Sequence, residues 1–509
     1  MLKATRVRAV LLGLLTLFFV SGPAIAEVQN VKVGGELNVR SFLRKNLRLN
    51  DGVSNNSGTT IYDAVADQGE SGDAFLQQLT ALDVAGDLTE NVKVSTRLIN
   101  QRVWGSPGDN AAGTGTSSDG NSVQVSLANV TLKELFYSPL TLVLGRQRLW
   151  YGRGFIVGSR LTHGDLDQDD ALAADEFSDL TGFDAARLIV DLGGAAPAGL
   201  PVTLDLVYAK VDENGVGAAG STDALPGNKD DTDLLGLNVG TKLDDMNGEA
   251  EAYFFRKHVQ SGNLNTATGF GSRSSHPVAN TLGVRGSVAP SEASSVWGEM
   301  AYQWGNAITT GATTAATTLT SEGALGDQYS AWAMNLGADF ALGDDTLNSK
   351  VGAEWIFYSG REGNATAING WDPMYRGSFT TALREFQAPG FYPNAQTGAT
   401  FDGTTTFNQI TASTSNQHQL ALHATVSPIE DLSIDNRATW FVADEGIVPV
   451  AGSKSHKYLG WEWDMQANYA YTDDVNVGLL YGLFLPGTVF RHPNDAAAQE
   501  LVTSVNVKF

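Results

Sequence analysis

The chain has 509 residues and a formal net charge of −23 at pH 7, from 33 Lys and Arg against 56 Asp and Glu. A protein this acidic does not bind nucleic acid non-specifically, because such binding depends on cations that neutralise phosphates. The sequence has no cysteine, which excludes disulfides, thiolate catalysis and metal sites with cysteine ligands.

Residues 1–26 have the pattern of a secretion signal. Three cationic residues precede an apolar run at 9–20, and the small-residue site Ala24-Ile25-Ala26 follows. The run is too short to span a bilayer as a helix, which takes roughly 20 apolar residues. We expect cleavage after Ala26. The remainder, 27–509, is predicted to be one domain, because no linker or composition break divides it.

The rest of the chain alternates apolar and polar residues with a period of two, which is typical of strands with one apolar face. At the C-terminus Leu501, Val505 and Phe509 share one face, while Ser504 and Lys508 lie on the other. The same pattern predicts eighteen strands, at 31–43, 74–86, 91–104, 123–135, 139–150, 183–193, 201–211, 233–243, 248–258, 279–289, 295–305, 330–342, 347–359, 416–427, 432–443, 457–470, 475–485 and 500–509.

The predicted strands are joined alternately by very short and very long connections. The segments 87–90, 244–247, 343–346 and 471–474 are tight turns, and each is flanked by much longer connections. Short periplasmic turns and long extracellular loops are typical of outer-membrane barrels, whereas a soluble sandwich or propeller has no reason to keep this asymmetry. The sequence therefore predicts an all-β, transmembrane antiparallel β-barrel of about 18 strands in the outer membrane of a Gram-negative bacterium.

Aromatic residues support a membrane location. Trp461 and Trp463 lie near one end of a predicted strand and Tyr469 near the other, as in the girdles at headgroup depth, although core aromatics are an alternative. The terminal Phe509 resembles the signal recognised by barrel-assembly machinery. The expected partners are this machinery, outer-membrane lipid and lipopolysaccharide.

Acidic residues cluster in two long connections, at 165–176 and 230–233. Solvated loops explain these clusters, and bridging to lipopolysaccharide by divalent cations is the alternative.

Charges on the polar face are expected to line the lumen, because an Arg or Lys on the lipid face costs about 2–4 kcal/mol at the bilayer midplane. The first strands contribute mainly cations and the later strands mainly carboxylates, with Arg146 of ambiguous facing. Two interpretations fit: a transverse field that orients solutes, or ion pairs between neighbouring strands that stiffen the wall. The predicted pore-lining residues are Lys32, Arg40, Lys93, Arg97, Arg146, Arg187, Arg285, Glu299, Gln303, Asp339, Glu354, Arg437, Glu462 and Asp464.

The longest connection, 361–415, has two interpretations. It holds Trp371, Arg376 and Glu385, and it can either fold into the lumen, as porin loops do, or form an outer lid.

An enzyme is the alternative from a different functional class. No catalytic Ser-His-acid set can be assembled from the spacing of the seven His residues, although triads are recognised by geometry. His418 and His423 are an odd number of residues apart, so they are expected to face opposite sides of one strand and not to share a metal. No catalytic residue, metal or cofactor is predicted.

Several short motifs resemble the alginate-export family of outer-membrane barrels. The first are Leu144-Gly145-Arg146-Gln147 and the later Gly182-Phe183-Asp184-Ala185-Ala186-Arg187-Leu188. Further agreement comes from Glu299-Met300-Ala301-Tyr302-Gln303-Trp304-Gly305, from Trp371-Asp372-Pro373-Met374-Tyr375, and from Gly460-Trp461-Glu462-Trp463-Asp464. Each motif is weak alone, but they occur in the family's order from about residue 75 to the end.

The resemblance implies a monomeric eighteen-stranded barrel that passes a polysaccharide or another polar solute across the outer membrane without energy input. In that family an Arg- and Lys-rich pore draws the polyuronate through, and Arg146 and Arg187 occupy the matching motif positions. The acidic later strands do not match a pore for a polyanion alone. A general or solute-specific diffusion porin is therefore the alternative. A purely structural barrel would normally carry a periplasmic domain, and the sequence pattern predicts none here.

Overall fold

The structure, a computed structural model, describes residues 29–46, 73–104, 123–160, 178–193, 200–212, 232–259, 278–306, 328–343, 347–360, 367–368, 370–372, 374–383, 385, 399–400, 406–407, 415–447, 454–490 and 495–509. The predicted signal peptide at 1–26 and the acidic cluster at 165–176 lie outside the described residues, as do positions 230 and 231 of the second cluster.

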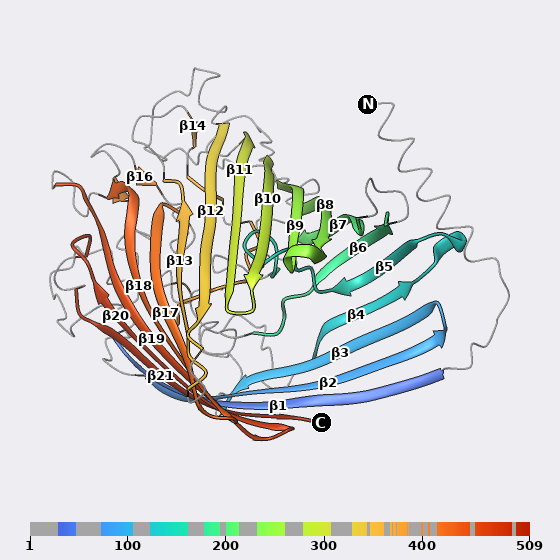
Figure 1. Cartoon of the computed structure of the whole chain (residues 1–509), viewed down its shortest axis with the longest axis horizontal. Coiled ribbons are helices and arrows are strands. Elements are labelled where there is room, and N and C mark those ends of the chain that lie inside the picture. Colours follow the sequence, from blue (N-terminus) through green and yellow to red (C-terminus); the bar gives the residue numbers. More distant parts are fainter. Residues whose placement is uncertain are drawn as a thin grey trace, which may run out of the picture.

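Eighteen antiparallel strands form a closed barrel. Each strand pairs with the next in chain order, and β21 returns to pair with β1 from Glu36↔Lys508 to Lys45↔Gln499 (Figure 1). Closure leaves no unpaired edge, as a membrane-spanning sheet requires. The predicted architecture and strand number are therefore confirmed. The wall consists of β1 (Gln29–Lys45), β2 (Asp73–Thr89), β3 (Val92–Val103), β4 (Gln124–Leu132), β5 (Leu140–Gln147), β6 (Phe183–Asp191), β7 (Val202–Asp212), β8 (Thr232–Leu243), β9 (Gly248–Val259), β10 (Val278–Ser291), β11 (Ser294–Asn306), β12 (Gln328–Ala341), β13 (Lys350–Tyr358), β17 (Gln417–Ile429), β18 (Leu432–Ile447), β19 (His456–Thr472), β20 (Val475–Pro486) and β21 (Ala498–Lys508).

The remaining described elements are short. The two-residue strand β14 (Ala367–Ile368) runs parallel to β12, and β15 (Ala399–Thr400) pairs with β16 (Thr406–Phe407). Two 3₁₀ turns, η2 (Leu135–Tyr137) and η4 (Asp244–Met246), lie in short connections. In the described parts of the chain, no helix is long and apolar enough to cross a membrane.

The register assigns alternate residues of every strand to opposite faces. Val39, Val505 and Val477 lie opposite one another on β1, β21 and β20, and Val505 and Val477 are exposed on the outside. The adjacent row contains Arg40 and Ser504 and faces the lumen. Because the pleat has a period of two, a slip of one residue would turn the apolar row inward.

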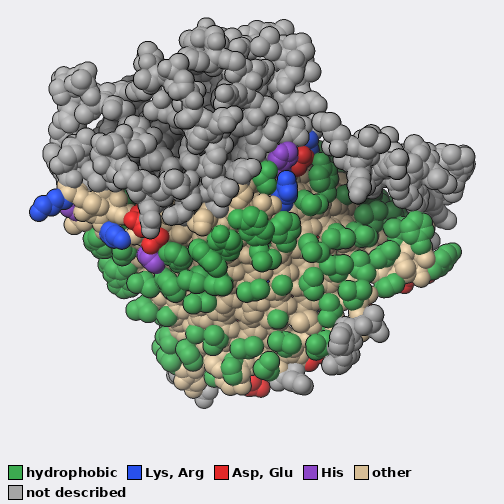
Figure 2. All heavy atoms as spheres, turned by 90° about the horizontal axis from the view of Figure 1, so that it is seen from above, with side chains coloured by type: hydrophobic (Ala, Val, Ile, Leu, Met, Phe, Trp, Pro, Cys, Tyr) green, Lys and Arg blue, Asp and Glu red, His purple; other side chains and the backbone are tan. Residues whose placement is uncertain are grey.

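The outer face carries an apolar band. Figure 2 shows hydrophobic side chains covering it, with Lys, Arg, Asp, Glu and His gathered mainly along its edges. The long connections lie at one end of the barrel, the long-connection end, and the tight turns lie at the other, the short-turn end. Among the described strand positions that face outward, charged residues occur only toward the long-connection end. Tyr302 and Trp332 pack with ring centroids 4.6 Å apart toward that end, and Tyr469 is exposed toward the short-turn end. The band thus has the arrangement of a membrane-spanning barrel.

Candidate pore and its inner segments

The inner face is polar and partly open to water. The side chain of Arg148 is 54% exposed, that of Asp83 45% and that of Glu249 42%, and all three face the interior. Charged side chains with these exposed fractions inside a closed wall indicate a water-containing lumen, because moving an ionised group from water into an apolar interior is costly.

Arg97 on β3 is the centre of a charged cluster. Its guanidinium is 2.9 Å from Glu36 on β1 and 2.5 Å from Asp179 in the β5–β6 connection, and it also pairs with Asp83 on β2. Arg148 reaches Asp179 at 2.6 Å. Three carboxylates therefore surround two cations here, so the first strands do not form a purely basic wall.

Basic and acidic side chains of different strands also pair elsewhere on the inner face. Arg187 on β6 lies 2.5 Å from Asp205 on β7, and His423 on β17 lies 2.6 Å from Asp339 on β12. The further pairs are Arg285 with Glu249 and Glu251, and Arg437 with Glu354. Cations and carboxylates are interspersed along the described wall. Of the two interpretations, paired charges that stiffen the wall account for these residues, and segregation into opposed walls does not.

The first inner segment, residues 149–159, follows β5 and crosses the lumen. Phe155 stacks on Tyr358 of β13 with ring centroids 5.5 Å apart. Tyr151 contacts Phe255 of β9 at 5.1 Å, and Arg153 lies 4.3 Å from the ring of Trp297 on β11. The segment starts at β5 and reaches β13, so it occupies part of the interior.

The second inner segment, residues 371–385, belongs to the β13–β17 connection. Asp372 forms an ion pair of 3.3 Å with Lys257 on β9, and its backbone N–H donates to Gln303 on β11 at 2.9 Å. Tyr375 packs edge-on against Phe183 of β6 at 5.6 Å. The described residues of segment 371–385 in connection 361–415 therefore lie in the lumen, which is the porin-like interpretation.

Carboxylates of the later strands hold this segment in place. The backbone N–H of Leu383 donates to Glu462 at 2.6 Å, and that of Ala382 donates to Asp464 at 3.4 Å. Glu462 and Asp464 were predicted to line the pore, and they do face inward. The hydrogen bonds show that they receive the inner segment.

A buried ion pair closes the second inner segment. Arg376 and Glu385 are 2.8 Å apart and almost fully buried, and Gln419 of β17 donates to Glu385 at 2.9 Å. Burial by itself raises the pKa of a carboxyl, but Arg376 and the hydrogen bonds from Thr380 and Gln419 outweigh it and lower the pKa of Glu385. Glu385 is thus held ionised inside the barrel.

The two inner segments contact each other at a pair of glycines. The backbone N–H of Gly158 donates to the carbonyl of Tyr375 at 2.7 Å, and Val157 pairs with Tyr375 in a parallel bridge. A Cβ on Gly377 would lie 2.5 Å from the carbonyl carbon of Gly158. Only glycine allows this approach, so the segments form one constriction.

Most of the predicted pore residues lie on the inner face, and Arg146 does not. Arg146 shares the parity of Leu142 and Leu144 and pairs with the outward-facing Asp184, so it lies on the outer face near the long-connection end. Lys32 and Lys93 lie toward the short-turn end. Those on the inner face are Lys32, Arg40, Lys93, Arg97, Arg187, Arg285, Glu299, Gln303, Asp339, Glu354, Arg437, Glu462 and Asp464.

Two buried contacts on this wall were not expected. Glu299 accepts a hydrogen bond from Tyr253 at 2.7 Å, and Gln303 bonds both the N–H and the carbonyl of Asp372. Sequence reasoning missed Tyr151, Phe155 and Asp179 because they follow no strand pattern. The available signal was a run of large apolar residues inside a connection.

The two histidines of β17 lie on opposite faces, as their odd spacing predicted. His418 faces outward, 3.6 Å from Asp444, and His423 faces Asp339. Among the described residues, no group of three His, Asp or Glu side chains is arranged to hold a metal ion.

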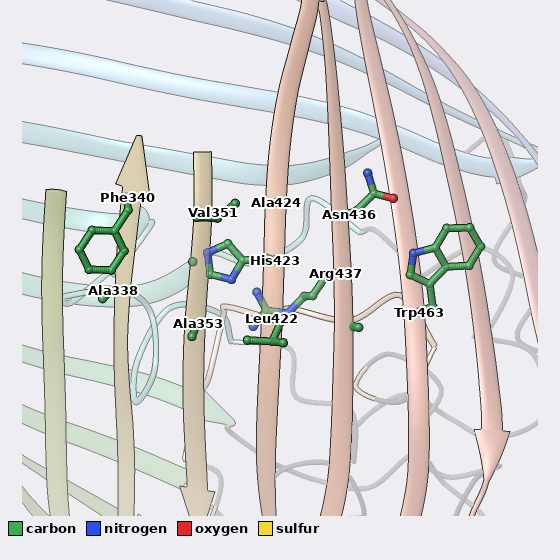
Figure 3. A pocket seen from close by; sticks show the side chains of 12 residues that line it. Ala338, Phe340, Val351, Ala353, Leu422, His423, Ala424, Asn436, Arg437 and Trp463 are labelled. Atoms are coloured by element: carbon green, nitrogen blue, oxygen red, sulfur yellow. The ribbon is translucent and has the colours of Figure 1, made fainter. Parts of the chain in front are cut away.

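A groove over β12 to β19 belongs mainly to the outer wall. Phe340, Trp463 and the small side chains of Ala338 and Ala353 are among the residues that line it (Figure 3). These residues share the outward register, so the groove is part of the apolar band. His423 and Arg437 reach it only from the inner face.

Comparisons with known proteins support the fold. The chain matches no protein-family model and no curated protein sequence. Its structure is similar to that of OccAB1 from Acinetobacter baumannii, with a TM-score of 0.52 and 11% identity over 96% of this chain and 99% of that one. OpdQ from Pseudomonas aeruginosa has a TM-score of 0.49 and 12% identity over 94% and 98%. The resemblance to alginate exporters stays a prediction from motifs, and the chain shares the barrel fold of OccAB1.

Proposed function

We propose that the protein is a passive channel in the outer membrane of a Gram-negative bacterium, through which small polar or charged solutes diffuse. The observation that carries this proposal is the set of water-exposed charges, such as Arg148 and Asp83, on the inner face of a closed barrel. The uncharged outer band supplies the membrane-facing surface.

The two inner segments favour a narrow, selective channel over a wide one. A barrel of this strand number encloses an aqueous lumen unless something fills it. Here residues 149–159 and 371–385 occupy part of that lumen and are held by Arg187, Gln303 and Glu462. We infer that solutes pass beside this constriction, in contact with the cluster around Arg97.

Export of an anionic polysaccharide is a second candidate. It is favoured by the motif resemblance and by the inward cations Lys32 and Lys93, which have no carboxylate within salt-bridge distance among the described residues. The carboxylates paired with Arg97 oppose it, because they reduce the attraction for a polyanion.

Planar-bilayer recording of the purified, refolded protein tests the function. We expect discrete single-channel conductance without an energy source, and a smaller anion preference in Arg148→Gln because an exposed lumenal cation is lost. Lys457→Gln, an exposed cation outside the lumen, is the matched control and should leave selectivity unchanged. Absence of conductance from correctly folded protein would overturn the proposal.

The same recordings separate the two candidates. Block by oligouronates, with little effect of the monomeric uronate, would favour polysaccharide passage. A channel that conducts the monomer and is not blocked by the oligomer would support the small-solute channel.

A further inference from the structure

A row of ionisable side chains crosses five neighbouring strands on the outer face. The register places each member opposite the next, and basic and acidic side chains alternate along the row. The row runs along the edge of the apolar band, toward the long connections, where Figure 2 shows charged side chains and His gathered. Its members are Arg146, Asp184, Lys210, Asp233 and His258, on β5 to β9.

Hydrogen bonds fix the row in place. Arg146 donates to both oxygens of Asp184, from Nε at 2.9 Å and from Nη2 at 2.7 Å. Lys210 lies 3.3 Å from Asp233, which also accepts a hydrogen bond from Tyr208 at 2.9 Å. The carboxylates therefore orient the cations and leave their outer surfaces accessible.

Arg256 adds a positive charge next to this row. It faces outward on β9, two residues before His258 and opposite Asn280 of β10, and it is exposed. The ion pairs found among the described residues do not include it. Because strands lie about 4.8 Å apart and alternate residues about 6.7 Å apart, Arg256 and Lys210 lie within roughly 10–12 Å of each other. Together Arg146, Lys210 and Arg256 outnumber the two carboxylates.

We propose that this row, together with Arg256, binds the phosphate groups of the lipid A part of lipopolysaccharide in the outer leaflet. Guanidinium groups bind phosphate with paired hydrogen bonds, and basic residues at a membrane surface attract anionic headgroups. Tyr208 and Trp304, on the same outward row as Arg256, supply the amphipathic rings expected at headgroup depth. The proposal rests on the outer-membrane location proposed above.

Native mass spectrometry of the detergent-solubilised barrel with bis-phosphorylated lipid A tests the site. Arg256→Gln should weaken binding about five-fold, and Lys210→Gln with Arg256→Gln by more than ten-fold, since each cation near a headgroup contributes about this much. Lys45→Gln is the matched control. It removes an outward cation of β1 at the same end of the barrel as the proposed site but away from it, and lipid A should bind this variant as it binds the unmodified protein. Heat-modifiable gel mobility confirms that each variant is folded.

The remaining outcomes each decide the proposal. Equal binding of dephosphorylated lipid A, or equal weakening in Lys45→Gln, would overturn it by showing that phosphate or this location is not recognised. Displacement of lipid A by millimolar inorganic phosphate alone would also overturn it, because the site would then bind a free anion. Conductance measured on the same variants separates the lipid A site from the channel function. Lipid A binding without conductance would contradict the channel function and support the lipid A site.

Discussion

The ion pair between Arg376 and Glu385 stabilises the constriction from within one of its segments. Both charges lie inside the barrel, and removing one partner of such a buried pair costs roughly 3–5 kcal/mol because the other is left uncompensated. The pair connects Arg376 with the last residue of the second inner segment. Glu462 and Asp464 hold the backbone of Leu383 and Ala382 between them. A change at this pair should act on the pore and leave the strands intact.

We predict that acid releases the second inner segment. The pKa of Glu385 is lowered from its ordinary value of 4.5, so its contribution to docking is fully present above pH 4.5 and is lost as the pH falls through the lowered value. Single-channel conductance should therefore rise only below about pH 4.5. Glu385→Gln should show the larger, noisier conductance already at neutral pH.

Glu292→Gln is the control for this prediction, because Glu292 is exposed in the turn between β10 and β11. It should keep the conductance of the unmodified protein and its acid response. If Glu385→Gln conducts like the unmodified protein at neutral pH and its conductance still rises in acid, protonation of Glu385 does not release the segment.

At the scale of elements, the constriction is made of two connections that depend on each other. Segment 149–159 reaches across to β13, and segment 371–385 reaches from β9 to β19. They meet where Gly158 and Gly377 allow the backbones to approach. Apart from the bridge between Val157 and Tyr375, the described residues of these segments have no strand pairing, so each segment is positioned by the wall and by the other.

We predict that Gly377→Val separates the two segments. The new side chain would lie 2.5 Å from the Gly158 carbonyl carbon, which is backbone and cannot rotate away. Conductance should increase several-fold, and the segments should become sensitive to protease in the folded barrel. Gly286→Ala is the control, because its Cβ would meet its nearest atom at 3.6 Å, an ordinary contact. Unchanged conductance in folded Gly377→Val would contradict a shared constriction.

At the scale of the whole molecule, the barrel separates two solvents. Outward positions between the rims carry no charge in the described strands, whereas inward positions at the same depth carry ion pairs. Adjacent residues of one strand therefore experience hydrocarbon and water in turn.

We predict that this difference can be read at two neighbouring positions of β21. The chain has no native cysteine, so a fluorophore attached to Val505→Cys or Ser504→Cys reports one site alone. In vesicles, a lipid-borne quencher should act on the label at 505, while aqueous iodide should act on the label at 504. The opposite pattern, or lipid quenching at both positions, would show that the wall does not have these two faces.

The sequence by itself determined the number of strands and which side of each strand faces lipid. These properties are local: the pleat forces a period of two, and an apolar face at every second position follows from the bilayer. Arg146 also follows the two-residue period, because it lies an even number of residues from the outward-facing Leu142 and Leu144 and therefore faces outward too. Its charge is tolerated because it lies at the edge of the apolar band and pairs with Asp184.

Only the tertiary structure decided what fills the barrel. Tyr151, Phe155, Arg376 and Glu385 lie in connections without periodicity, and their partners, such as Tyr358 and Gln419, are distant in sequence or on other strands. Their positions depend on how a closed cylinder brings inner faces together, which no local pattern records. Glu462 and Asp464 of the predicted acidic strands are an example. They accept hydrogen bonds from backbone N–H groups that only the folded inner segment supplies.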